Sequence, residues 1–151
     1  MSKAQPLIAI VDDEEPVRRA FGRLFRSASL TVETFASGAE FLAALEQHEP
    51  DCVVLDLCMP LLSGLALQAS LAKVGRRLPV VIVTGNDSPE ARRRAAEGGA
   101  AAYLRKPVDD KTLLEAVEAA IARVRRVPSI ASTETGTDRR QDQPQGNPDT
   151  G

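Results

Sequence analysis

Five short apolar runs alternate with longer amphipathic stretches between residues 6 and 127. Apolar runs rich in branched side chains and separated by helical stretches are typical of parallel strands with helices on both faces of the sheet. The second run, Leu30–Phe35, alternates more between apolar and polar residues, which indicates a strand at an edge of the sheet. The runs are Leu7–Val11, Leu30–Phe35, Cys52–Leu55, Val80–Val83 and Ala101–Leu104.

The stretches between the runs carry helix start and stop signals. Pro16 suits a first helical turn, and Ser37 with Glu40 three positions later forms a capping box. Ser88-Pro89-Glu90 predicts a helix start, and Gly98-Gly99 predicts its end. These signals predict an α/β protein of (βα)₅ type, with a doubly wound parallel five-stranded sheet of flavodoxin-like architecture. The predicted buried stripe of the first helix is Val17, Ala20, Phe21, Leu24 and Phe25. A weaker pattern predicts a helix over Leu65–Ala72. Asp109 or Asp110 is expected to cap the last helix.

The composition changes sharply near Pro128. From there to Gly151 the only apolar residues are Ile130 and Ala131, among many Ser, Thr, Asp, Gln, Pro and Gly residues. So few apolar side chains cannot offset the entropy lost on ordering the chain. We therefore expect one folded domain over residues 1–127 and a disordered polar tail over residues 128–151.

Charge and cysteine content narrow the class of protein. The chain has 19 basic and 21 acidic residues and a net charge of -2, so no overall positive charge draws it to nucleic acid or to an anionic membrane. Its apolar runs are shorter than the roughly 18 residues of a membrane span, and its N-terminus lacks a signal-peptide pattern. This predicts a cytoplasmic protein in which Cys52 and Cys58 are free thiols. His48 is the only histidine, which disfavours a zinc site or a Ser-His-Asp triad.

Polar residues follow four of the predicted strands. Asp12 and Asp13 follow the first, Asp56 the third, Thr84 the fourth, and Lys106 comes after the fifth. Because parallel strands end at the same edge of a sheet, these side chains should converge there. Clustered carboxylates repel one another unless a cation lies among them, and an all-oxygen ligand set favours Mg²⁺. A metal, an ammonium and a hydroxyl around Asp56 predict phosphoryl transfer with Asp56 as the nucleophile.

Five motifs in order resemble the receiver domain of two-component response regulators, over about residues 6 to 125. They are Ile10-Val11-Asp12-Asp13-Glu14, Val54-Leu55-Asp56-Leu57-Cys58-Met59-Pro60 with Ser63-Gly64, Ile82-Val83-Thr84-Gly85, Gly99-Ala100, and Tyr103-Leu104-Arg105-Lys106-Pro107. The resemblance implies that a histidine kinase or a histidine phosphotransfer protein donates a phosphoryl group to Asp56. It also implies that Mg²⁺ is held by Asp13, Asp56 and the backbone carbonyl of Cys58, with Asp12 acting partly through water.

The same resemblance assigns a switch to the other motif residues. Lys106 and Thr84 would contact the phosphoryl oxygens, and Tyr103 would turn inward as Thr84 moves toward the phosphate. The peptide bond before Pro107 would be cis. The output face would comprise the helix that contains Arg92, the fifth strand and the last helix, for a homodimer or another protein partner.

Two other classes share features with this sequence. A flavodoxin-like electron carrier should have a first loop that cradles phosphate, whereas the four acids of Asp12–Glu15 would repel it. An aspartyl-phosphate phosphatase usually has a second Asp two positions after the nucleophile, where this chain has Cys58. We therefore expect a phosphoacceptor rather than an enzyme, with at most weak self-dephosphorylation.

The output of the module is left open by the sequence. Thr34-Phe35-Ala36-Ser37-Gly38 and Ser63-Gly64-Leu65 are similar to the receiver subgroup that carries a C-terminal DNA-binding helix-turn-helix. After Val127 there is no second amphipathic helix pair, so no direct DNA binding is expected. The alternatives are a protein partner, a phosphate sink that competes for a kinase, and a receiver fragment of a larger DNA-binding regulator.

Overall fold

The computed structural model describes residues 5–47, 49–57, 64–73 and 78–126. The chain divides into two units, residues 1–121 and 122–151, and of the second only the end of one helix is described. The predicted tail, His48 and Cys58 lie outside the described residues, so the statements about them stay predictions. Within the described ranges, no helix combines the length and the apolar character that crossing a membrane requires.

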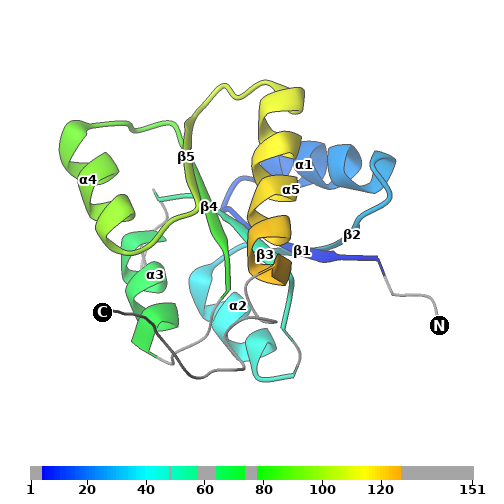
Figure 1. Ribbon diagram of the computed structural model, residues 1–151, viewed down its shortest axis with the longest axis horizontal. Coiled ribbons are helices and arrows are strands. Elements are labelled where there is room, and N and C mark those ends of the chain that lie inside the picture. The colour runs from blue at the N-terminus through cyan, green and yellow to red at the C-terminus, as the bar shows by residue number, and fades with distance from the viewer. Residues whose placement is uncertain (1–4, 48, 58–63, 74–77, 127–151) are drawn as a thin grey trace, which may run out of the picture. The chain divides into compact units, whose positions relative to one another are not determined.

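Five strands alternate with five helices along the described chain, as the hydrophobic pattern predicts. All five strands are parallel, in the order β2-β1-β3-β4-β5, which confirms the (βα)₅ doubly wound sheet and places β2 at an edge (Figure 1). The strands are β1 (Leu7–Val11), β2 (Thr31–Phe35), β3 (Cys52–Leu55), β4 (Val80–Thr84) and β5 (Ala102–Arg105). The helices are α1 (Glu15–Ser27), α2 (Gly38–Leu45), α3 (Gly64–Lys73), α4 (Pro89–Glu97) and α5 (Asp110–Arg126).

The strand order changes direction between β1 and β3. The chain runs from β1 outward to β2 and then returns past β1 to β3, so the loops that leave β1 and β3 diverge at this point. In doubly wound sheets this is where ligands bind, at the carboxyl ends of the strands. Val11 and Leu55 are register partners, so the residues that follow them, Asp12 and Asp56, lie next to each other.

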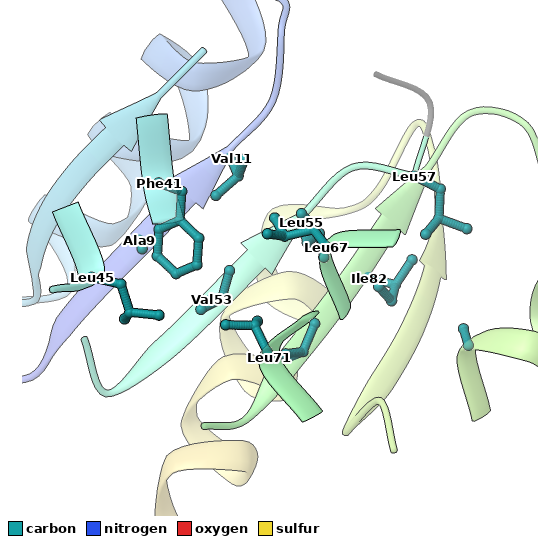
Figure 2. Packing of buried hydrophobic residues seen from close by; sticks show 12 residues of the cluster. Ala9, Val11, Phe41, Leu45, Val53, Leu55, Leu57, Leu67, Leu71 and Ile82 are labelled. Carbon is teal, nitrogen blue, oxygen red and sulfur yellow. The ribbon is translucent and has the colours of Figure 1, made fainter. Parts of the chain in front are cut away.

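Two apolar clusters cover the two faces of the sheet. Alternate side chains of β1 and β3 point to opposite faces, so Ala9 and Val53 join one cluster while Ile8 and Val54 join the other. The first cluster packs under α2, α3 and α4, and Figure 2 shows Phe41 and other members of it. The second packs under α1 and α5. Burial of β1, β3 and β4 on both faces explains why their sequences are almost continuously apolar.

Three of the predicted helix starts have side-chain caps, and α1 instead has Pro16 in its first turn. Ser37, Ser88 and Asp109 each accept a hydrogen bond from the backbone amide three residues later, at 3.0 to 3.2 Å. The second half of the capping box differs from the prediction, because the Glu40 carboxylate accepts from the amide of Ala36 rather than from that of Ser37. Ala36 precedes the N-cap residue Ser37, so this hydrogen bond holds the chain just before the helix begins.

The buried side of α1 includes Phe21, Leu24 and Phe25 of the predicted stripe but not Ala20. Phe25 is fully buried, Gly22 is also buried, and Ala20 is exposed. At about 100° per residue, Ala20 lies roughly 140° around the helix from Phe25, whereas Gly22 lies only about 60° away. The prediction for Ala20 is therefore wrong, because the apolar positions of α1 span a wider arc than the sheet covers.

Candidate functional site

Three carboxylates converge at the carboxyl ends of β1 and β3. Asp12 and Asp56 are 3% and 5% exposed, while Asp13 is exposed to solvent. One carboxylate oxygen from each of the three lies within 4.8 Å of the others. The Asp56 amide donates to the carbonyl of Val11 at 3.1 Å, which extends the β1–β3 pairing up to the site. Sheet register therefore brings together side chains that are far apart in the sequence.

Lys106 adds a cation to these carboxylates. Its Nζ lies 3.0 Å from Asp12 Oδ2 and 3.9 Å from Asp56 Oδ1. Partial burial by itself would lower the pKa of Lys106. The hydrogen bond and charge of Asp12, followed by the charges of Asp56 and Glu14, outweigh that effect and hold the pKa above its ordinary value. Lys106 is therefore an ammonium at neutral pH. We call Asp12, Asp13, Asp56 and Lys106 the acidic pocket.

Asp12 is held in place through both carboxylate oxygens and through its backbone. Oδ1 accepts from the amide of Glu14 at 2.9 Å, and Oδ2 accepts from Lys106. Its carbonyl accepts from the guanidinium of Arg18 at 2.8 Å. Arg18 was not among the predicted site residues, because an arginine in a helix gives no signal of what lies beside it. These contacts fix Asp12 before any ligand binds.

The acidic pocket fits a hard divalent cation. Among its four residues, three carboxylates lie with one ammonium, and two of the carboxylates, those of Asp12 and Asp56, are buried. The three carboxylates offer only oxygen atoms as metal ligands, which favours Mg²⁺ over softer transition metals. Asp12, Asp13 and Asp56 would hold the ion. The predicted further ligand, the backbone carbonyl of Cys58, lies outside the described residues.

Thr84 ends β4 at the same edge of the sheet and is fully buried. Its carbonyl accepts from the amide of Lys106 at 2.8 Å, which ties the end of β4 to the loop that carries the lysine. Its Oγ1 accepts from the amide of Asn86 at 3.0 Å, so the hydroxyl stabilises its own turn. The Lys106–Pro107 peptide bond is cis.

Tyr103 lies apart from the acidic pocket. Its phenol donates a hydrogen bond to Asp87 Oδ1 at 2.9 Å, and the Arg92 guanidinium carbon lies 5.5 Å from the centre of its ring. Arg92 also donates to Asp87 Oδ2 at 2.7 Å, and Arg105 Nε lies 3.9 Å from the same oxygen. We call Asp87, Arg92, Tyr103 and Arg105 the Asp87 cluster. Sequence reasoning missed Asp87, whose only signal is its position before the helix cap Ser88.

The ionisation of the Asp87 cluster follows from its contacts. Partial burial would raise the pKa of Asp87, but the hydrogen bonds from Tyr103 and Arg92 and the charges of Arg92 and Arg105 lower it below its ordinary value. Burial, and then the hydrogen bond and negative charge of Asp87, raise the pKa of Tyr103, against smaller opposing effects from the backbone of Ser88 and from Arg92. At neutral pH the cluster therefore holds a carboxylate, a neutral phenol and two guanidinium groups.

Comparison with known proteins links this arrangement to one family. The family model for the response regulator receiver domain matches residues 8–118. Nodulation protein W of Bradyrhizobium diazoefficiens is 37% identical over 125 residues, which cover 83% of this chain and 55% of that protein. Transcriptional regulatory protein TdiR of Thauera aromatica is 39% identical over 115 residues, which cover 76% of this chain and 51% of that protein. The chain thus spans about half the length of these relatives.

A solved structure agrees with the fold and with the extent of the match. The crystal structure of a response regulator receiver protein from Burkholderia phymatum is 40% identical, with a TM-score of 0.71, and covers 78% of this chain and 96% of that one. The family match includes all five strands and the edge where Asp12, Asp13, Asp56 and Lys106 meet. On this sequence match and this fold, the chain belongs to the response regulator receiver domain family of two-component systems.

Proposed function

We propose that this chain is a phosphoacceptor in a two-component phosphorelay. A histidine kinase or a histidine phosphotransfer protein donates the phosphoryl group, and Asp56 accepts it. The observation that carries the proposal is the convergence of three carboxylates and one ammonium at the end of a central strand. Asp56 is the proposed nucleophile, because it is buried directly after the central strand β3 and has a carboxylate oxygen within 4.8 Å of those of Asp12 and Asp13.

The chemistry requires one bond to form and one to break. A carboxylate oxygen of Asp56 attacks the phosphorus of a phosphohistidine, and a P–O bond forms as the P–N bond breaks. The imidazole leaves with the bonding electron pair and takes up a proton. Lys106, held protonated by its neighbours, offsets negative charge on the phosphoryl oxygens, and the Thr84 hydroxyl donates to one of them.

Mg²⁺ is the proposed cofactor. When bound, it supplies a positive charge that offsets the repulsion between the carboxylates and the phosphoryl group. Asp13 and Asp56 are the proposed direct carboxylate ligands, together with the backbone carbonyl of Cys58. Asp12 is proposed to act partly through water, and its engagement with Glu14 and Lys106 supports that role.

The proposed output is a protein interaction that depends on phosphorylation. The proposed surface is formed by α4, β5 and the described part of α5 up to Ile121, and its partner is a second copy of the chain or a different protein. Competition for the phosphoryl groups of a kinase is the alternative output. We propose no DNA contact for the receiver itself and no catalytic turnover beyond slow self-dephosphorylation.

Intact-mass measurement with acetyl phosphate and Mg²⁺ tests the phosphoacceptor. We expect one added phosphoryl group on the wild type and none on Asp56→Asn. Asp51→Asn is the matched control. Asp51 immediately precedes β3, whereas Asp56 immediately follows it, and the Asp51 carboxylate accepts from the amide of Leu7 at the opposite end of the strand. Undiminished labelling of Asp56→Asn would overturn the assignment.

A further inference from the structure

The Asp87 cluster joins three separate segments of the chain. Asp87 lies in the turn between β4 and α4, Arg92 on α4, and Tyr103 and Arg105 on β5. This turn lies at the same end of the sheet as the loop from β5 to α5 (Figure 1). Each oxygen of Asp87 has its own donor, the phenol of Tyr103 on one and the guanidinium of Arg92 on the other. A hydrogen bond to an ionised acceptor is stronger than one between neutral groups, so the carboxylate fixes the direction of the phenol.

The rest of the Tyr103 side chain supports a single orientation. Tyr103 is the register partner of Ile82 on β4 and packs against the apolar cluster that lies under α4. Its ring lies under the guanidinium of Arg92, which adds a cation–π contact to the hydrogen bond. The phenol is therefore held toward α4 by contacts with the turn and with the helix.

We propose that Asp87 is a positioning residue, which holds Tyr103 toward α4 in the unphosphorylated protein and so opposes phosphorylation of Asp56. The inference rests on the function proposed above. Its physical basis is linkage: the hydrogen bond from Tyr103 to Asp87 stabilises only the arrangement in which it forms. A ligand that favours an inward Tyr103 must break that bond, so the bond lowers the affinity for that ligand, at most by the factor by which it stabilises the outward arrangement.

The turn gives this coupling a direct route from the acidic pocket. The Thr84 hydroxyl accepts a hydrogen bond from the amide of Asn86, and Asn86 immediately precedes Asp87 in the chain. Movement of Thr84 toward a phosphoryl oxygen therefore shifts the segment that carries the Asp87 carboxylate. Removal of Asp87 removes the bond that this movement has to break.

The first test measures the contact itself, without any phosphoryl chemistry. Tyr103 is the only tyrosine and the chain has no tryptophan, so absorbance near the tyrosinate band reports on one phenol. A pH titration should show the phenol of Asp87→Ala ionising at lower pH than that of the wild type, because the neighbouring negative charge and acceptor are gone. Glu97→Ala is the matched control, since it removes the exposed Arg93–Glu97 ion pair from the same helix. An unchanged titration in Asp87→Ala would overturn the proposal.

The second test measures the coupling with beryllofluoride, a mimic of the phosphoryl group, in the presence of Mg²⁺. From amide shifts of the acidic pocket we expect Asp87→Ala to bind about two- to tenfold more tightly than wild type, the range that one hydrogen bond contributes. Tyr103→Phe, which lacks only the hydroxyl, should show the same gain. The double variant should show no further gain, because both changes remove one interaction. Glu97→Ala should bind as wild type does.

The outcomes separate this inference from the proposed function. Equal affinity of wild type, Asp87→Ala and Tyr103→Phe would overturn the positioning role while leaving Asp56 as the acceptor. Absence of binding in every variant, with Asp56→Asn indistinguishable from wild type, would overturn the proposed function and this inference with it. Weaker binding by Asp87→Ala would reverse the sign of the coupling and also overturn the proposal.

Discussion

The acidic pocket and the Asp87 cluster lie at the same end of the sheet but have opposite charge balance. The acidic pocket has three carboxylates around one ammonium, and the Asp87 cluster has one carboxylate beside two guanidinium groups and a phenol. Both oxygens of Asp87 have donors within the protein. Among the four residues that define the acidic pocket, three carboxylates lie with one ammonium, and burial makes repulsion between the carboxylates costly. We therefore expect a cation to bind at the acidic pocket rather than at the Asp87 cluster.

The position of each group in the sheet explains this difference. Asp12 and Asp56 end strands that are buried on both faces, whereas Asp87 lies in a turn near the β5 edge and keeps 21% of its side chain exposed. Solvent and salt screen charges in the turn more than charges between central strands. The charges of Asp12 and Asp56 are therefore screened less than the charge of Asp87.

Magnesium binding gives the largest expected difference between the acidic pocket and the Asp87 cluster. At about 100 times its dissociation constant, Mg²⁺ should stabilise the wild type by about 2.7 kcal/mol. Asp13→Ala should lose most of this stabilisation, because it removes a carboxylate from the acidic pocket, and Asp87→Ala should keep it. Urea unfolding with and without Mg²⁺ measures both. Equal loss in the two variants would mean that the ion does not bind in the acidic pocket.

Removal of the ammonium tests how the pocket balances its charge. Lys106→Met should lower the free energy of unfolding by about 2 kcal/mol without Mg²⁺, because Asp12 loses a partly buried partner. Saturating Mg²⁺ should reduce this loss, since the ion supplies positive charge. Lys111→Met is the control: it removes a contact between exposed side chains, so its stability should change by less than about 0.5 kcal/mol. A loss of the same size with and without Mg²⁺ would contradict the charge argument.

Neutralising one carboxylate in each region should change stability in opposite directions. Without Mg²⁺, Asp13→Asn should stabilise the protein by about 0.5 kcal/mol, because it relieves repulsion between carboxylates. Asp87→Asn should destabilise it, because Arg92 and Arg105 lose the charge that they face. Thermal or urea unfolding at low salt decides the sign. Changes of the same sign would show that charge balance does not distinguish the two regions.

The smallest expected effect is the acid dependence of the Asp87 cluster. Since the pKa of Asp87 is below its ordinary value of 3.8, the folded state binds fewer protons than the unfolded state in this range. Its contribution to stability is thus present above pH 3.8 and is lost as the pH falls through the folded-state pKa. The stability difference between wild type and Asp87→Asn should be constant near neutral pH and shrink below about pH 4. A difference that grows on acidification would contradict the assignment.

Much of the fold follows from local pattern. Runs such as Cys52–Leu55 and Val80–Val83 are apolar because helices cover both faces, and that cause acts on each strand separately. The meeting of Asp12, Asp56 and Lys106 also follows, because parallel strands end at one edge whatever their order. The exposure of Ala20 on α1 and the contact of Arg18 with Asp12 do not follow, because they depend on where the helix packs on the sheet.

The strands, the caps Ser37, Ser88 and Asp109, the family and the residues of the acidic pocket could be predicted from the sequence, because each follows from a short-range pattern or a motif. The partners of Asp87 and Gln68 are visible only in the folded structure. Gln68 is buried on α3 and donates to the carbonyl of Ala95 at the end of α4.

Gly98 and Gly99 are predicted as a helix stop, and Gly99 has a φ of 88° that favours glycine. Gly98 is small for another reason: a Cβ there would lie 2.7 Å from the Gln68 carboxamide. Such contacts join residues that are distant in the chain, so their cause is the packing of α3 against α4 rather than the sequence around either residue.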